Sequence, residues 1–577
     1  MKLKINEILL VAGMAGAAFW LAYFAPVDYS GFDPLGNLAT AQAMLRHGTI
    51  KLDADRDRLP GYVNGWHLRE KSGHLYYHYP LGTPMAALPF VWAANRAGWD
   101  MTNRDDDAAL QNLLSALTTS GACALLYLLC RLYAPVGVSC GLAGAFAFGS
   151  SIVSTLGTAL WNVNAQMLFL LLGLWLLLRH VCGAARRHSG YWVGLCFSCA
   201  YLCRPTALIV IGVAVGYCAV KYWRFGAKIA AVYLLVMAAL MAFSWHEYRQ
   251  LLPDYYLPQQ LGAAANVWTA LRGHLVSPSR GVLVYSPHLL VTLFACGWLF
   301  GRLRREPLFW FAAAWIAGHL ALIAKNSMWW GGGCFGGRLF TEALPACLLL
   351  TLLAWQQRGA ASVLARRIAA AAFVILAGVG MYINTAQGLY NPSTLDWGDA
   401  HLFDWRCPQF LASPECLAAR DIREQQNSLE PYRLGEKIQP NGRNAIFAGW
   451  YWLETSEYGQ FRWSRGRQAR VLFNMDALEK RAEAELLLEM RLGAYHRQQV
   501  EIFLNQHSLG KLTLDSILPT EQTLRLPAAF LNDGNKMNVL TFDLPDAVAP
   551  RQFYGKGRIR AIGVSVWRVK LREIAAN

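Results

Sequence analysis

Charged residues are scarce in this sequence: Asp, Glu, Lys and Arg make up 16% of its 577 residues, whereas 55% are hydrophobic. A soluble protein ordinarily carries about 25% charged residues. The deficit is local, because apolar runs long enough to cross about 30 Å of hydrocarbon recur up to residue 387 and then stop. The composition excludes a single soluble body. It predicts an α-helical polytopic membrane domain, 1–389, followed by a soluble domain, 390–577.

Acidic residues are the scarcer charged class, with 37 Asp and Glu against 53 Lys and Arg, for a formal net charge of +16. An excess of cations can indicate nucleic-acid binding. Here, however, the basic residues gather in short loops between apolar runs, at 179–187, 221–228, 302–305 and 358–367. Cytoplasmic loops retain positive charge. We therefore expect no nucleic-acid partner, and we place these loops and the N-terminus on the cytoplasmic side of a bacterial inner membrane.

About eleven segments are expected to span the membrane, a number that keeps every basic loop inside. They are 8–26, 108–131, 136–157, 164–180, 190–203, 206–220, 228–246, 283–301, 307–324, 339–356 and 367–387. The first is interpreted as a retained helix, since no small-residue cleavage site follows it. The segment 83–98 is short and contains Pro84 and Pro89, which we expect to interrupt it. We interpret it as a re-entrant or interfacial helix of the outer loop 27–107.

Long apolar runs are absent after Tyr390, where short alternating runs are separated by Gly, Pro and Asn. Examples are Val500–Leu504 and Val539–Leu544. This pattern predicts an extracytoplasmic, all-β sandwich. Aromatic residues at 449–454 and 461–464 would stack on sugar rings if exposed, as in a carbohydrate-binding domain, or fill the core if buried.

Eleven of the thirteen cysteines lie in or beside apolar runs, where Cys acts as a small hydrophobe. Cys407 and Cys416 lie instead in the soluble part. Outside the cell, the two could form a disulfide.

Carboxylates are few just beyond the first predicted span, where a lipid phosphate would lie. Asp28 and Asp33 are the two there. We predict Asp33 as a catalytic base, with Asp28 as the alternative. Asp33 precedes Pro34, so it could also cap a helix that starts near Leu35.

Cations and glycines define two further outer clusters. Arg280 lies in a Ser/Gly loop, and Arg338 ends the glycine-rich run 331–337; their guanidinium groups suit a donor phosphate, with Lys325 and Arg204 next. The alternative is that such residues contact lipid headgroups.

Aromatic and polar residues of the same loops are candidates for substrate binding, or else an aromatic belt at the membrane surface. They are His78, Tyr79, Trp329, Trp330 and Glu342. No cluster of metal ligands stands out, so we predict no metal site and no certain cofactor. A divalent metal is left open.

Taken together, these clusters resemble the GT-C superfamily of membrane glycosyltransferases. Within it, the likeness is to bacterial enzymes that use polyprenyl-phosphate sugars: aminoarabinose, lipopolysaccharide-core and arabinofuranosyl transferases. It covers roughly 1–390 and includes the runs Tyr79-Pro-Leu-Gly-Thr83, Leu202-Cys-Arg204-Pro-Thr206 and Trp329-Trp-Gly-Gly…Gly-Arg338. A β-sandwich after the last span resembles the arabinofuranosyl branch. The resemblance implies a first-loop Asp as base, which maps onto Asp33, although the Asp-Glu pair of many members is absent.

The implied reaction is transfer of a sugar from a polyprenyl-phosphate carrier to a glycan, lipid or exported protein on the outer face, with inversion. Nucleotide sugars are not available outside the cytoplasm, so the donor must be membrane-borne. A phosphate leaving group requires no general acid, so one base and cations suffice. A flippase or transporter of lipid-linked sugars is an alternative, but it should show internal repeats and mid-membrane charges. A non-catalytic glycan-assembly protein is a third hypothesis.

Overall fold

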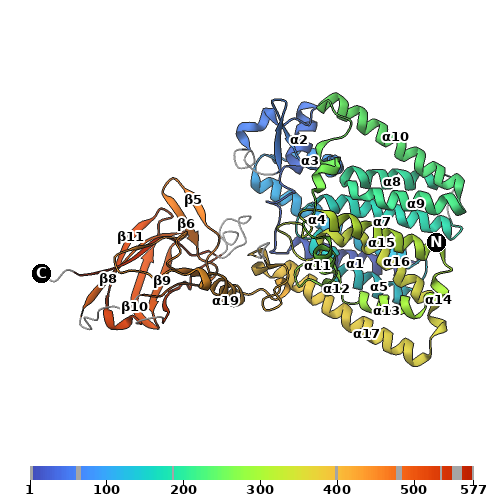
Figure 1. Ribbon diagram of the computed structural model, residues 1–577. Coiled ribbons are helices and arrows are strands. Elements are labelled where there is room, and N and C mark those ends of the chain that lie inside the picture. Colours follow the sequence, from blue (N-terminus) through green and yellow to red (C-terminus); the bar gives the residue numbers. More distant parts are fainter. Residues whose placement is uncertain are drawn as a thin grey trace. The chain divides into compact units, whose positions relative to one another are not determined.

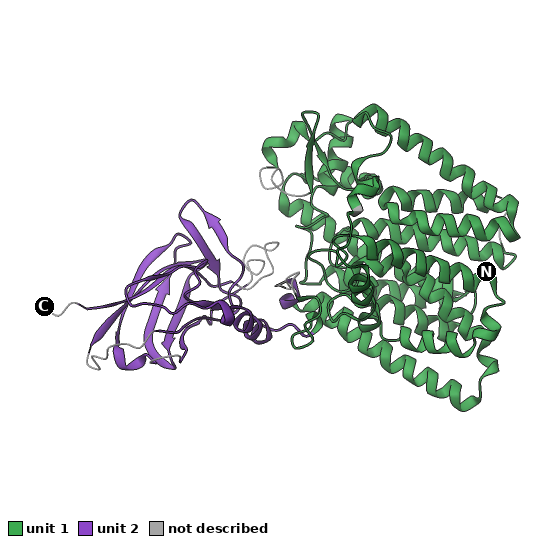
Figure 2. Cartoon of the chain, in the orientation of Figure 1, with its two compact units in different colours: residues 1–391, 397–410 green, residues 392–396, 411–577 purple. Residues whose placement is uncertain are grey.

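The chain folds into two compact units in the structure, a computed structural model (Figure 2). The structure describes residues 4–59, 67–184, 188–396, 401–475, 484–532, 536–548 and 562–574. The first unit comprises 1–391 and 397–410, and the second comprises 392–396 and 411–577. Residues 401–410 therefore belong to the helical unit, whereas we expected the boundary at 389/390. The difference arises because this segment bonds to loops of the helical unit, as shown below.

Helices of very different length build the first unit (Figure 1). Seven regions of the described chain are long and apolar enough to cross a membrane. They contain α1 (Ile5–Tyr23), α4 (Arg104–Cys130), α7 (Asn162–Val181), α10 (Trp223–Tyr248), α15 (Pro307–Lys325), α16 (Leu344–Gln356) and α17 (Val363–Met381). Four expected spans instead hold shorter apolar helices, namely α5 (Val136–Phe148), α8 (Ser189–Cys203), α9 (Leu208–Lys221) and α13 (Leu289–Trp298). A total of eleven crossings stays a prediction.

Two proline-containing segments behave differently from each other. Arg204 has extended backbone angles (φ −154°, ψ 130°), so α8 ends there and α9 follows a short turn, as predicted. In contrast, α3 (Gly82–Arg96) runs through Pro89, and the expected interruption is wrong. Pro84 lies in the first turn, where its missing N–H costs little. Tight packing holds the helix in place, since a Cβ on Gly82 would lie 2.4 Å from the backbone nitrogen of Cys203.

Segments predicted to face outward lie at one end of the bundle. They include α2 (Asn37–His47), α3 and α11 (Val267–Val276), and α12 (Val282–Tyr285), at the start of the expected span 283–301, lies at the same end. In contrast, α14 (Phe300–Leu303), which overlaps the basic run 302–305, lies at the other end (Figure 1). This arrangement agrees with the alternation of loops on which the predicted topology rests.

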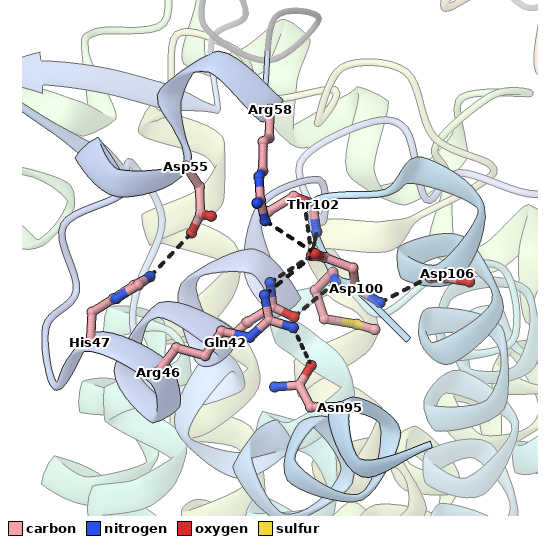
Figure 3. A network of polar contacts seen from close by, with 10 residues as sticks. Gln42, Arg46, His47, Asp55, Arg58, Asn95, Asp100, Thr102 and Asp106 are labelled. Atoms are coloured by element: carbon pink, nitrogen blue, oxygen red, sulfur yellow. Dashed lines mark hydrogen bonds and ion pairs between the residues drawn. The ribbon is translucent and has the colours of Figure 1, made fainter. Parts of the chain in front are cut away.

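The partly exposed carboxylate of Asp100 connects several parts of the outer loop 27–107 (Figure 3). Its Oδ1 accepts hydrogen bonds from Gln42 Nε2 (2.7 Å) and Thr102 Oγ (2.8 Å), and its Oδ2 lies 3.4 Å from a guanidinium nitrogen of both Arg46 and Arg58. Burial raises the pKa of Asp100, but these hydrogen bonds outweigh it and hold that pKa well below its usual range. The C-terminal half of α2 is therefore bonded to Asp100, just after the C-terminal end of α3.

A short antiparallel hairpin, β1 (Leu68–Lys71) and β2 (His74–Tyr77), completes the outer loop. Its buried side chains Leu68, Leu75 and Tyr77 pack against α2 in one apolar cluster. Since α2 begins at Asn37 after Gly36, Asp33 is not its N-cap, and that alternative is wrong.

The second unit is a β-sandwich, as the alternating pattern predicts. Its strands are β3 (Lys437–Ile438), β4 (Ile446–Ala448), β5 (Glu454–Ser456), β6 (Gly459–Trp463), β7 (Gln468–Phe473), β8 (Glu485–Ala494), β9 (Gln498–Leu504), β10 (His507–Leu514), β11 (Thr520–Pro527), β12 (Asn538–Asp543) and β13 (Val564–Glu573). One sheet has the order β10-β9-β12-β7-β4 and the other β11-β8-β13-β6-β5, with β3 beside β13. Inward residues of both sheets share one apolar core.

The aromatic residues at the start of the sandwich are mostly structural. Trp450 belongs to the main core, and Phe461 and Trp463 form a second cluster with Trp567. Trp452, at 49%, is the most exposed tryptophan of this group.

The two cysteines that follow the last expected span are oxidised. Cys407 and Cys416 are disulfide-bonded, and the other eleven cysteines are free.

Candidate active site

Two tyrosines fix Asp33 between α1 and α2. The Tyr79 hydroxyl donates to carboxylate Oδ1 of Asp33 (2.8 Å), and the Tyr77 hydroxyl donates to its backbone carbonyl (2.7 Å). Both tyrosines come from β2 and the residues just after it, so one short stretch holds the side chain and the backbone of the acid. The Asp33 side chain is 28% exposed, which leaves it reachable by a substrate hydroxyl.

Arg338 lies against the other carboxylate oxygen. One terminal guanidinium nitrogen is 2.9 Å from Asp33 Oδ2, and the other donates to the Gly331 carbonyl (2.6 Å). The guanidinium carbon lies 4.0 Å from the centroid of the Trp161 ring, a cation–π contact. The buried Nε has no hydrogen-bond partner within the described residues. Arg338 therefore holds Asp33 and uses two of its five N–H groups in the bonds to Asp33 and Gly331.

A pocket of about 450 Å³ lies close to this pair, although neither Asp33 nor Arg338 lines it. Tyr79, which bonds Asp33, is part of its wall. Most of the wall is apolar and comes from α3, α8 and α10: Met85, Leu88, Leu202, Val236, Ala239, Leu240 and Phe243. The polar and charged lining residues include Arg69, Lys71, His78 and Asp254. The pocket is therefore amphipathic, with a cationic and aromatic end close to Asp33.

Two side chains show how the polar end is arranged. Lys71 Nζ lies 2.8 Å from Asp254 Oδ1, which connects the β1–β2 hairpin to the segment after α10. Burial lowers the pKa of His78 to about 4, so its ring is neutral at physiological pH. We infer that His78 offers a hydrogen bond and a ring face, not a charge.

Arg280 has a different setting from the one we expected. It is 1% exposed, and its guanidinium donates to the carbonyls of Trp330 (2.6 Å) and Gly332 (3.1 Å) and to the Gln409 amide oxygen (2.7 Å). These bonds hold the backbone in and beside the glycine-rich loop in place. They favour a structural role for Arg280 over the expected phosphate contact.

Arg204 and Glu342 form an ion pair below the outer surface. Glu342 is 2% exposed and also accepts hydrogen bonds from Gln166 Nε2 (2.8 Å) and the Thr206 hydroxyl. This geometry favours Glu342 as an anchor between helices over the expected contact with substrate. Tyr255, whose ring lies 5.4 Å from that of Tyr79, interacts electrostatically with both ion pairs.

The remaining predicted residues lie farther from the Asp33–Arg338 pair. Trp329 is buried against His274, Trp330 is half-buried, and Lys325 is the exposed last residue of α15. Asp28 accepts a hydrogen bond from the Ser30 amide (2.7 Å). Neither Asp28 nor Asp33 lines the pocket, but Asp33 accepts a hydrogen bond from Tyr79, which does. The geometry thus favours Asp33 over Asp28 as the base.

No group of three or more His, Cys, Asp or Glu that could hold a metal ion occurs in the part of the chain that the structure describes. Three residues that complete the site, Trp161, Tyr255 and Gln409, are not predicted by any local sequence pattern. Their contacts to Arg338, Tyr79 and Arg280 join segments far apart in the chain.

No protein-family model and no curated protein matches the chain. Among solved structures, a family 35 carbohydrate binding module from Clostridium thermocellum matches 24% of this chain and 97% of its own length, with 15% identity and a TM-score of 0.17. The apo oligosaccharyltransferase of Archaeoglobus fulgidus matches 66% of this chain, with 12% identity and a TM-score of 0.37. The chain spans 56% of that second structure. Scores this low carry no argument, so function is argued from the site.

Proposed function

We propose that this chain is an inverting membrane glycosyltransferase that moves a sugar from a polyprenyl-phosphate carrier to an acceptor on the outer face. The observation that supports this most is the Asp33–Arg338 pair close to an amphipathic pocket. Transfer from a lipid phosphate requires a base, a cation for the phosphate and an apolar surface for the lipid. The Asp33 carboxylate, the Arg338 guanidinium and the apolar wall of the pocket can fill these roles. An arabinofuranosyl subtype stays a prediction, as do the sugar and the acceptor.

The reaction uses these groups as follows. An acceptor hydroxyl oxygen attacks the anomeric carbon from the side opposite the phosphate, and Asp33 takes the hydroxyl proton. The bond between the anomeric carbon and the phosphate oxygen breaks, and its electron pair leaves with the phosphate. Attack from the opposite side inverts the anomeric centre. A positioned base of this kind contributes about 10²–10⁴-fold to the rate.

The phosphate and the lipid find complementary surfaces nearby. A terminal N–H of Arg338 that neither Asp33 nor Gly331 uses can donate to a phosphate oxygen, because each terminal nitrogen carries two hydrogens. Arg69 and Lys71 add positive charge at the polar end of the pocket, and the α10 wall suits an isoprenoid chain. One arginine would then hold the base and the leaving group together.

The test uses the full-length protein in detergent micelles. A polyprenyl-phosphate pentose is supplied with glycan and lipid fractions of the cell envelope, and released polyprenyl phosphate and glycosylated products are followed by mass spectrometry. Asp33→Asn should reduce transfer by about 10²-fold or more while lipid-phosphate binding persists. Asp28→Asn is the matched control and should have a smaller effect.

Near-normal transfer by Asp33→Asn together with loss in Asp28→Asn would place the base at Asp28. If both variants remain active, the one-carboxylate mechanism is wrong. Absence of donor consumption by the wild-type protein with every fraction would favour a flippase, which a donor-translocation assay in vesicles measures directly.

A further inference from the structure

The segment 401–410 follows the last candidate span, yet it packs into the helical unit. The Ser277 hydroxyl donates to the backbone carbonyl of Leu402. The Phe403 ring lies 6.1 Å from that of Trp329, in the loop that precedes Arg338. This segment is therefore part of the wall behind the candidate site and not a free linker.

Gln409 is the centre of that packing. It is 1% exposed, and its amide oxygen accepts hydrogen bonds from an Arg280 guanidinium nitrogen (2.7 Å) and the Gly336 amide (3.2 Å). Its Nε2 donates to the Cys334 carbonyl (3.0 Å). One side chain thus bonds both the glycine-rich loop and the arginine that holds the loop from the other side.

The glycine-rich loop 331–337 depends on such outside partners. Five of its seven residues are glycine, and three of them, Gly331, Gly332 and Gly336, have positive φ angles of 77°, 66° and 63°. Glycine loses more conformational freedom on folding than other residues and brings no side chain to anchor the backbone. The loop conformation must therefore be fixed by groups from elsewhere in the chain.

The loop conformation in turn aims Arg338. The Arg338 amide donates to the Gly336 carbonyl (3.0 Å), so displacement of Gly336 displaces the guanidinium that lies on Asp33. We propose that Gln409 is a positioning residue of the active site, acting on the catalytic Arg338 through Gly336. The inference rests on the proposed function for its kinetic readout and is independent of it for its structural readout.

The test compares Gln409→Leu and Gln409→Glu in the full-length protein. Leu removes the hydrogen bonds of the side-chain amide, including a long one from the Tyr285 hydroxyl (3.5 Å), whereas Glu keeps the acceptor for Arg280 and Gly336 and loses the donor to Cys334. Amide hydrogen exchange across 331–338 should accelerate at least tenfold in Gln409→Leu and less in Gln409→Glu. Turnover should fall about 10- to 100-fold in Gln409→Leu, since a misplacement of about 1 Å can cost about 10²-fold. Gln409→Glu should recover most of that loss.

Gln425→Leu is the matched control. Gln425 lies in α19 (Pro414–Gln425) and bonds one backbone amide, that of Phe447 (3.3 Å), within the β-sandwich unit. Its substitution should leave exchange across 331–338 unchanged. Wild-type exchange in Gln409→Leu would overturn the inference, as would wild-type turnover in an active preparation. If the wild-type protein transfers no sugar, the proposed function fails, and the exchange comparison still decides the role of Gln409.

Discussion

Arg280 and Arg338 illustrate how two arginines in similar sequence contexts acquire different roles. Each lies at the end of a Gly- or Ser-containing outer segment. Arg280 donates hydrogen bonds to the carbonyls of Trp330 and Gly332 and to Gln409. In contrast, Nε of Arg338 has no hydrogen-bond partner among the described residues. The number of bonds already made, and not residue type, distinguishes them.

A paired substitution measures that difference. Arg338→Gln should lower kcat/KM for the donor by about 10- to 150-fold, because a charge-assisted bond to phosphate contributes about 1.5–3 kcal/mol. Arg280→Gln should instead lower the unfolding temperature, because it leaves buried carbonyls without a donor. The measurements are initial rates against donor concentration and thermal unfolding in detergent. Equal kinetic losses with equal stability would contradict this assignment.

His78 leads to a prediction about pH. Burial lowers its pKa to about 4 in the folded protein, against 6.5 for an exposed ring. Between these values the unfolded chain binds a proton that the folded chain does not, so acid favours unfolding. The stability contributed by the neutral ring is complete above pH 6.5 and is lost as the pH falls towards 4. Unfolding temperatures from pH 7 to 4 should drop less steeply in His78→Asn, and parallel curves would refute the idea.

At the residue scale, the sequence predicts site residues where chemistry and position coincide, and their roles stay predictions. Asp33 and Arg338 were both singled out, and the structure brings them within 2.9 Å. The partners Trp161, Tyr255 and Gln409 were missed, because nothing local distinguishes them. Gln409 meets Gly336 across 73 residues of chain, and only tertiary structure creates that contact.

At the scale of elements, the glycine-rich loop has little room for added side chains. A Cβ on Gly336 would lie 2.7 Å from the Tyr285 ring, and its φ of 63° is strained for any residue with a side chain. Gly336→Ala should therefore abolish most transfer and lower the unfolding temperature. Gly359→Ala is the control, since no atom lies within 4 Å of its added Cβ. Normal activity in Gly336→Ala would show that the loop tolerates displacement.

Element boundaries were predictable where the backbone itself decides them. The break between α8 and α9 follows from Arg204-Pro205, since a residue before proline is driven to extended angles. The strands of the sandwich follow from strict alternation, as in β9 and β12. The unbroken α3 was not predictable, because packing of Gly82 on Cys203 outweighs the local effect of Pro89.

For the whole molecule, the arrangement of helices leads to a test of topology. Segments predicted to be outside lie at one end of the bundle, and a basic run lies at the other (Figure 1). A phosphatase reporter fused after Asn577 should be active, and one placed in the 358–362 turn should be inactive. The reverse pattern would move the candidate site to the cytoplasmic face and remove the reason for a lipid-linked donor.

The position of Gln409 in the chain also sets an order of events during synthesis. A ribosome adds about 5–20 residues per second, so the 73 residues between Gly336 and Gln409 take about 4–15 s to appear. Until then the glycine-rich loop has been made but lacks the amide that holds it. A nascent chain whose helices have all inserted is thus still inactive, and its catalytic arginine is aimed only once the segment beyond the last helix has emerged and docked.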